Sequence, residues 1–91
     1  MWSILALEDR QAIFDYVELD KPSAAVRLDD RIESQVAALG QFPEMGREGR
    51  VKNTRELVVE RTPYIAAYRV HKEKVDILRV LHSARIWPDS M

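Results

Sequence analysis

The hydrophobic period of this chain changes once, across residues 42–49, and that change restricts the fold more than any other feature. Before it, apolar residues recur every three or four positions, as on one face of an α-helix: Ala25, Leu28, Ile32, Val36 and Leu39. After it, residues 54–59, 64–70 and 75–81 are rich in β-branched and aromatic side chains, which is typical of strands. Helices followed by strands predict an α+β domain.

A weaker helical pattern precedes this stripe, over residues 4–17. Lys21-Pro22 interrupts it, and Pro22 suits the first turn of a second helix. Gly40 follows the stripe directly, as a helix C-terminus prefers. We therefore expect an antiparallel helical hairpin.

The segments between the strand patterns, residues 60–63 and 71–74, are short enough for β-hairpins. Residues 42–49 contain Pro and two Gly and are expected to form a loop. We expect a single domain, residues 1–91, with the helical hairpin on one face of a small antiparallel sheet. Met1-Trp2 would supply only a vestigial first strand.

Composition excludes several classes of site. The chain has no cysteine, so it has neither disulfides nor thiolate metal ligands. Two histidines, His71 and His82, do not make a zinc shell, and we expect no metal, cofactor or small-molecule ligand. No apolar run approaches about 18 residues, so we expect no membrane association and a cytoplasmic protein.

Charge is distributed unevenly along the chain. Residues 1–46 carry four basic and nine acidic side chains, a balance of −5, whereas residues 47–91 carry ten basic and six acidic, a balance of +4. This asymmetry indicates a face that meets an anionic or acidic partner, although a sheet edge guarded by solvated cations is an equally good interpretation. The candidate partner or nucleic-acid contacts are Arg47, Arg50, Lys52, Arg61, Arg79 and Trp87.

His82 ends an apolar strand pattern and could act as a general acid or base, with Arg85 beside it for anion contact. A histidine that only hydrogen-bonds at a strand end is the competing interpretation. Trp87 is expected to fold back over the core, and Tyr68 to lie on the buried face. No phosphate-binding glycine loop, nucleophile elbow or carboxylate pair is visible.

Three patterns together resemble the RelE/ParE toxins of bacterial type II toxin–antitoxin modules. They are GR-x-G-x-V-x-x-TREL from Gly46, PYI-x-x-YRV from Pro63 and ILRVLH-x-x-x-x-WP from Ile77. KPSAA, from Lys21, is similar to the opening of that family's second helix. The resemblance covers nearly the whole chain, and implies a cognate antitoxin whose extended C-terminal segment wraps the toxin.

The resemblance implies one of two activities. RelE-type members are ribosome-dependent endoribonucleases that cut mRNA, and ParE-type members poison DNA gyrase, so whether this chain is an enzyme stays open. Nuclease members carry an arginine where this chain has Ile65, and the remaining nuclease candidates are Arg55, His82 and Arg85. The sequence is therefore closer to the ParE type. A subunit that only binds antitoxin is a third reading.

Overall fold

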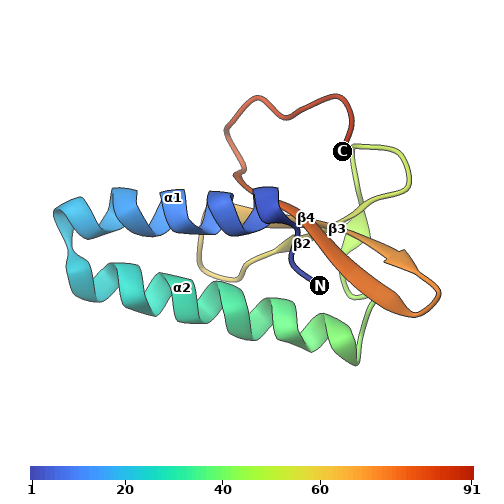
Figure 1. The fold of residues 1–91 in the computed structure, drawn as a ribbon, viewed down its shortest axis with the longest axis horizontal. Coiled ribbons are helices and arrows are strands. Elements are labelled where there is room, and N and C mark those ends of the chain that lie inside the picture. Colours follow the sequence, from blue (N-terminus) through green and yellow to red (C-terminus); the bar gives the residue numbers. More distant parts are fainter.

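The computed structural model describes residues 1–91, and its elements follow the predicted order (Figure 1). The strands form one antiparallel sheet in the order β1-β2-β3-β4. This confirms the predicted α+β fold. The elements are α1 (Ile4–Asp20), α2 (Pro22–Ala37), a 3₁₀ turn (Ala38–Gly40), β1 (Arg47–Glu48), β2 (Arg55–Val58), β3 (Tyr64–His71) and β4 (Lys74–His82).

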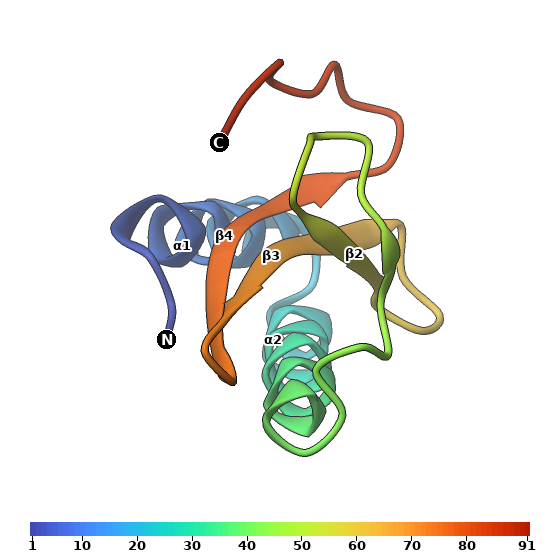
Figure 2. The same ribbon diagram turned by 90° about the vertical axis from the view of Figure 1, so that its right-hand side faces the viewer.

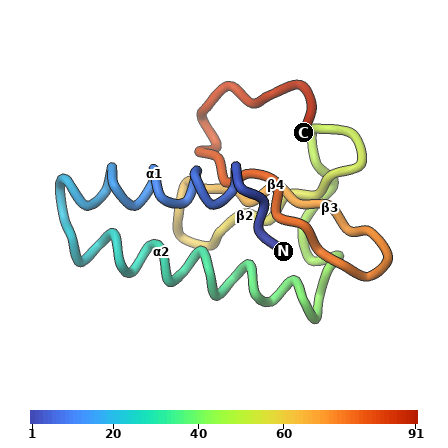
Figure 3. Tube along the Cα trace, in the orientation of Figure 1, coloured from blue at the N-terminus to red at the C-terminus, as the bar shows by residue number.

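The two helices are joined by a single extended residue, Lys21, and run antiparallel (Figure 3). Ser3 begins α1, because its side-chain oxygen accepts the backbone N–H of Ala6 at 3.0 Å. Pro22 occupies the first turn of α2, where its missing N–H is not needed. The helical stripe therefore forms the hairpin that the sequence predicts.

Two boundaries differ from the prediction. Helix α2 ends at Ala37 and tightens into the 3₁₀ turn, so Gly40 does not take up the left-handed backbone of a glycine cap. Residues 42–49 are not wholly a loop, because Arg47 and Glu48 pair with β2 as the short strand β1.

The β3–β4 turn is a two-residue hairpin loop. Lys72 and Glu73 have φ values of 49° and 65°, and His71 pairs with Lys74. Positive φ at both positions matches the right-handed twist of the strands, although neither residue is the glycine or asparagine that favours it. The predicted hairpin is confirmed.

The outer edge of β4 is covered by the N-terminal segment. Trp2 forms a parallel bridge with Ile77, whose N–H donates to the Met1 carbonyl at 2.8 Å and whose carbonyl accepts the Ser3 N–H at 2.9 Å. Further along β4, the Val80 N–H donates to a carboxylate oxygen of Asp9 on α1 at 2.9 Å. The first strand is vestigial, as predicted, and Asp9 of α1 supplies a further hydrogen-bond acceptor to the edge of β4.

The main core lies between the helices and one face of the sheet. Figure 2 shows α2 beneath the sheet and α1 along the β4 side. No helix is long and apolar enough to cross a lipid bilayer. The buried members of this cluster are Ala6, Ile32, Val36, Leu39, Leu57, Val59, Ala66, Tyr68, Ile77 and Val80.

Part of the opposite face of the sheet is also buried. Ile65 and Ala67 alternate along β3 with the core residues, so they point away from α2, and both are at most 3% exposed. Leu81 pairs with Ile65 and is 1% exposed. Residues 83–91, the C-terminal segment, lie on this side of the sheet (Figures 1 and 2). Helix α2 therefore covers one face of the sheet, and the C-terminal segment lies on the side of the other.

Candidate partner-binding surfaces

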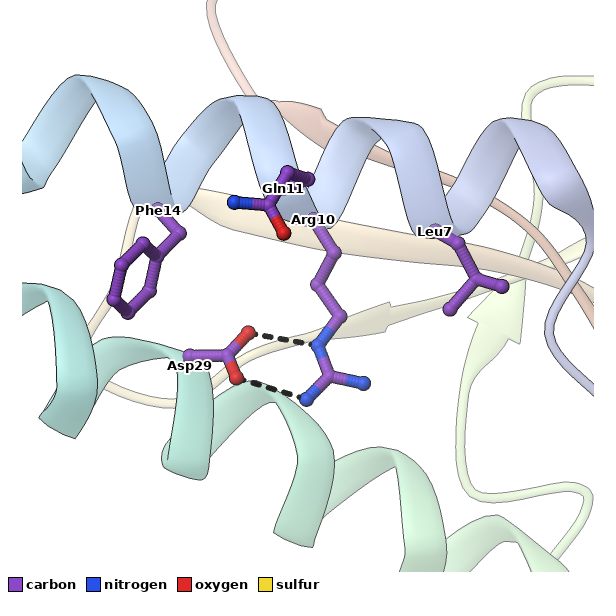
Figure 4. A pocket seen from close by; sticks show the side chains of 5 residues that line it. All are labelled: Leu7, Arg10, Gln11, Phe14 and Asp29. Carbon is purple, nitrogen blue, oxygen red and sulfur yellow. Dashed lines mark hydrogen bonds and ion pairs between the residues drawn. The ribbon is translucent and has the colours of Figure 1, made fainter.

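A groove lies between the two helices, with an ion pair at its centre (Figure 4). Arg10 of α1 binds Asp29 of α2 through two hydrogen bonds of 2.7 and 2.9 Å, and Leu7 and Phe14 lie on either side. We call this hollow of about 370 Å³, lined by Leu7, Arg10, Gln11, Phe14 and Asp29, the hairpin groove. Arg10 also donates to Glu33 of α2 at 2.9 Å, so its guanidinium is already engaged by two carboxylates. The apolar side chains are the groups of this groove that remain free for a partner.

The hairpin exposes more apolar surface than its own packing requires. Leu19 is 89% exposed, Ile4 76% and Tyr16 75%. Leu5, Leu7 and Val26 are each about half exposed on the same two helices. These side chains are distributed along both helices, and they give the hairpin an outer surface that is partly apolar.

Two of the predicted partner-binding arginines hold a buried carboxylate inside the protein. Glu56 of β2 is 2% exposed, and Arg47 and Arg50 contact it from 3.0 to 3.3 Å. The Arg50 backbone N–H also donates to it at 2.8 Å. Burial raises the pKa of Glu56, but the hydrogen bonds from Arg50 and Arg47 outweigh burial and hold that pKa below its ordinary value.

Trp87 continues this arrangement rather than joining the main core. The Arg50 guanidinium lies 3.7 Å from the centre of the Trp87 ring, and the indole N–H donates to the His82 carbonyl at 3.3 Å. The expectation that Trp87 folds back over the core needs correction, because it covers the Arg50–Glu56 ion pair on the other face of the sheet. It thereby fastens the C-terminal segment.

The glycines of the GR-x-G pattern are required by close packing. The Gly46 N–H donates to the Tyr68 hydroxyl at 2.8 Å, and that hydroxyl donates to the Pro43 carbonyl at 2.8 Å. A Cβ on Gly46 would lie 2.5 Å from the same hydroxyl oxygen, and one on Gly49 would lie 2.2 Å from the side-chain oxygen of Thr54. Tyr68 is fully buried, as predicted, and burial raises its pKa.

The three nuclease candidates do not form one site. His82 and Arg85 line a small hollow of about 200 Å³ beside α1, where His82 packs edge-on against Tyr64 at 5.5 Å. In β3, Tyr64 pairs with His82, whereas Tyr68 pairs with Arg55. Tyr64 and Tyr68 are four residues apart, which is about 13 Å along the strand. The His82 Nδ1 accepts the Ala84 N–H at 3.0 Å, so this nitrogen already has a local partner.

The remaining predicted contacts divide into exposed and paired residues. Lys52 and Arg61 are exposed in turns and take part in no ion pair, and Arg61 has a φ of 64°. Arg79 forms a two-point ion pair with Asp9 at 2.8 and 3.0 Å, which raises the Arg79 pKa. Arg79 therefore anchors α1 to β4.

Sequence reasoning missed the buried role of Glu56. Strand alternation placed Glu56 on the same side as Val58, which is 48% exposed, and a charged strand residue is ordinarily solvated. The available signal was the pair of arginines in GREGR, six and nine residues before Glu56. They come into reach of the carboxylate because β1 folds back onto β2.

A helical hairpin on a small antiparallel sheet, together with the GR-x-G-x-V-x-x-TREL pattern, is the arrangement expected of a RelE/ParE-type toxin. Residues 1–87 match the model of the family described as "ParE toxin of type II toxin-antitoxin system, parDE". The chain belongs to this ParE toxin family of type II toxin–antitoxin systems.

Individual relatives agree with this assignment. The candidate toxin Y4kP of Sinorhizobium fredii (strain NBRC 101917 / NGR234) is 45% identical over 96% of this chain and 90% of its own length. Toxin RelE2 of Caulobacter vibrioides is 38% identical over 94% of this chain and 96% of its own. A solved structure described as the chromosomal ParDE TA system from P. aeruginosa superposes with a TM-score of 0.83 at 32% identity, covering 89% of this chain and 90% of that one.

Proposed function

We propose that this ParE-family toxin inhibits growth by poisoning DNA gyrase, and that a cognate antitoxin neutralises it. The observation that carries the proposal is the burial of an apolar residue, Ile65, at a position that matters for cleavage. It is 3% exposed and lies between Val58 and Leu81 in neighbouring strands, at the position where the resemblance places a nuclease arginine. An isoleucine there offers neither charge nor protons to a phosphate.

The placement of the other nuclease candidates supports the same choice. General acid–base chemistry on a phosphodiester requires its groups to reach one reacting centre. Arg55 lies far along the sheet from His82 and Arg85. A toxin that acts by binding a large protein target needs no such convergence. The target in this proposal places the toxin in the cytoplasm.

The antitoxin contact is supported by the helical hairpin. The exposed apolar side chains of α1 and α2 and the hairpin groove between them offer a surface that an amphipathic segment could cover. The solved ParDE relative, by its description, belongs to a toxin–antitoxin system. We therefore propose that the antitoxin packs on the hairpin, with acidic and basic groups distributed to match the two halves of this chain.

Cleavage of mRNA on the ribosome is the second candidate function. One relative, 38% identical, is named Toxin RelE2, and this name favours it. In this alternative Arg55, Arg85 and His82 would take part in cleavage, with Arg50 or Lys52 near the phosphate. Arg50 is already engaged with Glu56, which weakens this alternative.

Two assays on the purified toxin separate the candidates. Under the gyrase proposal, the toxin inhibits plasmid supercoiling by gyrase and leaves translated mRNA intact. The variants His82→Ala and Arg85→Ala then inhibit supercoiling as strongly as the wild type. Intact supercoiling together with mRNA cut at codon boundaries would overturn the gyrase proposal in favour of cleavage. If cells that express the protein without antitoxin grow normally, both toxin activities are excluded, and the remaining hypothesis is a subunit that only binds antitoxin.

A further inference from the structure

The loop between the 3₁₀ turn and β1 exposes apolar side chains at the end of α2 that lies farthest from the helix–helix turn (Figure 1). Phe42 is 60% exposed and Met45 is 48% exposed. Both line an open hollow of about 590 Å³ that is formed by the loop alone, and its lining residues are Gln41, Phe42, Pro43, Glu44 and Met45. We call residues 41–46 the braced loop.

Two side chains of the sheet fix the backbone of the braced loop from inside. The hydroxyl of the buried Tyr68 donates to the Pro43 carbonyl and accepts the Gly46 N–H, each at 2.8 Å. The Arg55 guanidinium donates to the Gly46 carbonyl at 2.8 Å and to the Glu44 carbonyl at 3.4 Å. The loop is therefore supported at three of its carbonyls by residues of β2 and β3.

The loop is also continuous with the end of the helical hairpin. The Phe42 N–H donates to the Ala38 carbonyl and the Met45 N–H donates to the Phe42 carbonyl, each at 3.0 Å. A loop that is held in this way loses little conformational entropy when a partner binds it. Aromatic and methionine side chains are enriched in the buried centre of protein–protein interfaces. The braced loop therefore presents suitable anchor side chains on a preorganised backbone.

The charge of the hollow restricts its partner. Glu44 is the only ionisable residue that lines it, and this exposed carboxylate takes part in none of the ion pairs of the protein. A carboxylate beside apolar side chains suits a protein segment in which an apolar residue stands next to a lysine or arginine. A phosphate backbone would meet a like charge here, and a symmetric contact with a second copy of this chain would bring two Glu44 carboxylates together.

The braced loop is separate from the hairpin groove. The groove is centred on the ion pair of Arg10 with Asp29. Asp29 precedes Gln41 by twelve residues, which is about 18 Å along a helix. The two surfaces can therefore bind different proteins.

We propose that the braced loop is the surface through which the toxin holds gyrase, and that its hollow takes an apolar side chain of gyrase flanked by a lysine or arginine. This inference rests on the proposed gyrase function and deepens it, because it assigns the target contact to a surface other than the one proposed for the antitoxin.

The first test removes the apolar anchors with the double variant Phe42→Ser Met45→Ser. Ile86→Ser is the matched control, because Ile86 is 93% exposed and lies outside the loop. Inhibition of plasmid supercoiling by purified gyrase is measured against toxin concentration. The double variant should need about tenfold more toxin for half-inhibition, and the control should act as the wild type does.

The second test reverses the charge and keeps the apolar anchors. Glu44→Lys should weaken inhibition about tenfold at low salt and less at high salt, because its new cation meets the cation of the partner. Glu60→Lys is the control, since Glu60 is exposed and forms no ion pair, and it should inhibit as the wild type does. Glu44→Lys decides the question if circular dichroism shows that the double variant is unfolded.

Growth of cells that express each variant separates failure of this surface from failure of the gyrase function. A wild-type toxin that arrests growth but leaves supercoiling intact would refute the gyrase function. The loop then remains the target contact if the double variant no longer arrests growth, and it is refuted if growth still stops. A wild type that has neither effect refutes both.

Two further results would overturn the assignment of the loop to gyrase. One is inhibition of supercoiling by the folded double variant, and by Glu44→Lys, at wild-type concentrations. The other is a double variant that inhibits gyrase normally but is no longer neutralised by the co-expressed antitoxin, which would assign the loop to the antitoxin.

Discussion

Replacement of Glu56 by Gln tests whether the buried carboxylate holds the loop around it. Gln has nearly the same shape, but it removes the charge and turns one acceptor into a donor that faces a guanidinium. A hydrogen bond to a charged group contributes about 1.5–3 kcal/mol, and removing one partner of a fully buried ion pair costs about 3–5 kcal/mol. Since Arg47 and Arg50 are 55% and 42% exposed, water can satisfy their freed donors. We therefore expect Glu56→Gln to lower the free energy of unfolding by about 2 kcal/mol at pH 7.

The loss should depend on pH with a definite sign. The pKa of Glu56 in the folded protein lies below its ordinary value of 4.5, because hydrogen bonds from Arg50 and Arg47 outweigh burial, which alone would raise it. A depressed carboxylate pKa stabilises the folded protein above the unfolded pKa and ceases to do so as pH falls through the folded one. The difference between wild type and Glu56→Gln should therefore shrink as pH falls below 4.5.

Thermal unfolding followed by circular dichroism measures this difference. About 2 kcal/mol corresponds to a decrease of roughly 8–16 °C in Tm for a domain of this size. Glu60→Gln is the control, since Glu60 is exposed and forms no ion pair. It should leave Tm nearly unchanged at pH 7 and at pH 3. A loss for Glu56→Gln that is equally large at pH 7 and pH 3 would refute the ionic explanation and leave only altered packing.

Three further substitutions, one of them with a matched control, test other contacts. Gly46→Ala should lower the free energy of unfolding by about 2 kcal/mol, because its Cβ would meet the hydroxyl of the buried Tyr68. Gly40→Ala is the control, since a Cβ there has nothing within 4 Å and the backbone has no positive φ. Measured by urea unfolding, it should be neutral or stabilising by about 0.5 kcal/mol. Trp87→Ala should release the C-terminal segment, which limited trypsin digestion would detect as faster cleavage in residues 83–91 with little change in Tm; unchanged cleavage would contradict the stacking role. Asp9→Asn should cost about 2 kcal/mol by weakening the two-point ion pair to Arg79, and a loss below about 0.5 kcal/mol would show that pair to be dispensable.

The sequence predicts the elements of this protein because their signals are local. The stripe from Ala25 to Leu39 has a helical period, and the β3 pattern contains β-branched and aromatic residues in one run. Both signals depend on neighbours within a few positions, and the structure confirms both.

The roles of the charged residues could not be predicted in this way. Arg79 pairs with Asp9, seventy positions earlier, and no periodicity relates the two. Arg47 and Arg50 have the composition of a partner surface, but the return of β1 onto β2 directs them to Glu56. A count of basic residues therefore overestimates the positive charge that is free to contact a partner, because Arg47, Arg50 and Arg79 are engaged in ion pairs within the protein.

The sheet has two unlike edges. Residues 1–3 and Asp9 occupy the hydrogen-bonding groups of β4, whereas β1 pairs only with Arg55 and Glu56 and leaves Leu57 and Val58 at the edge of β2. A strand from another molecule can therefore add at one side alone. Association through strand pairing must stop after a single addition, so a filament that requires two complementary edges on every subunit has no means to propagate from this fold.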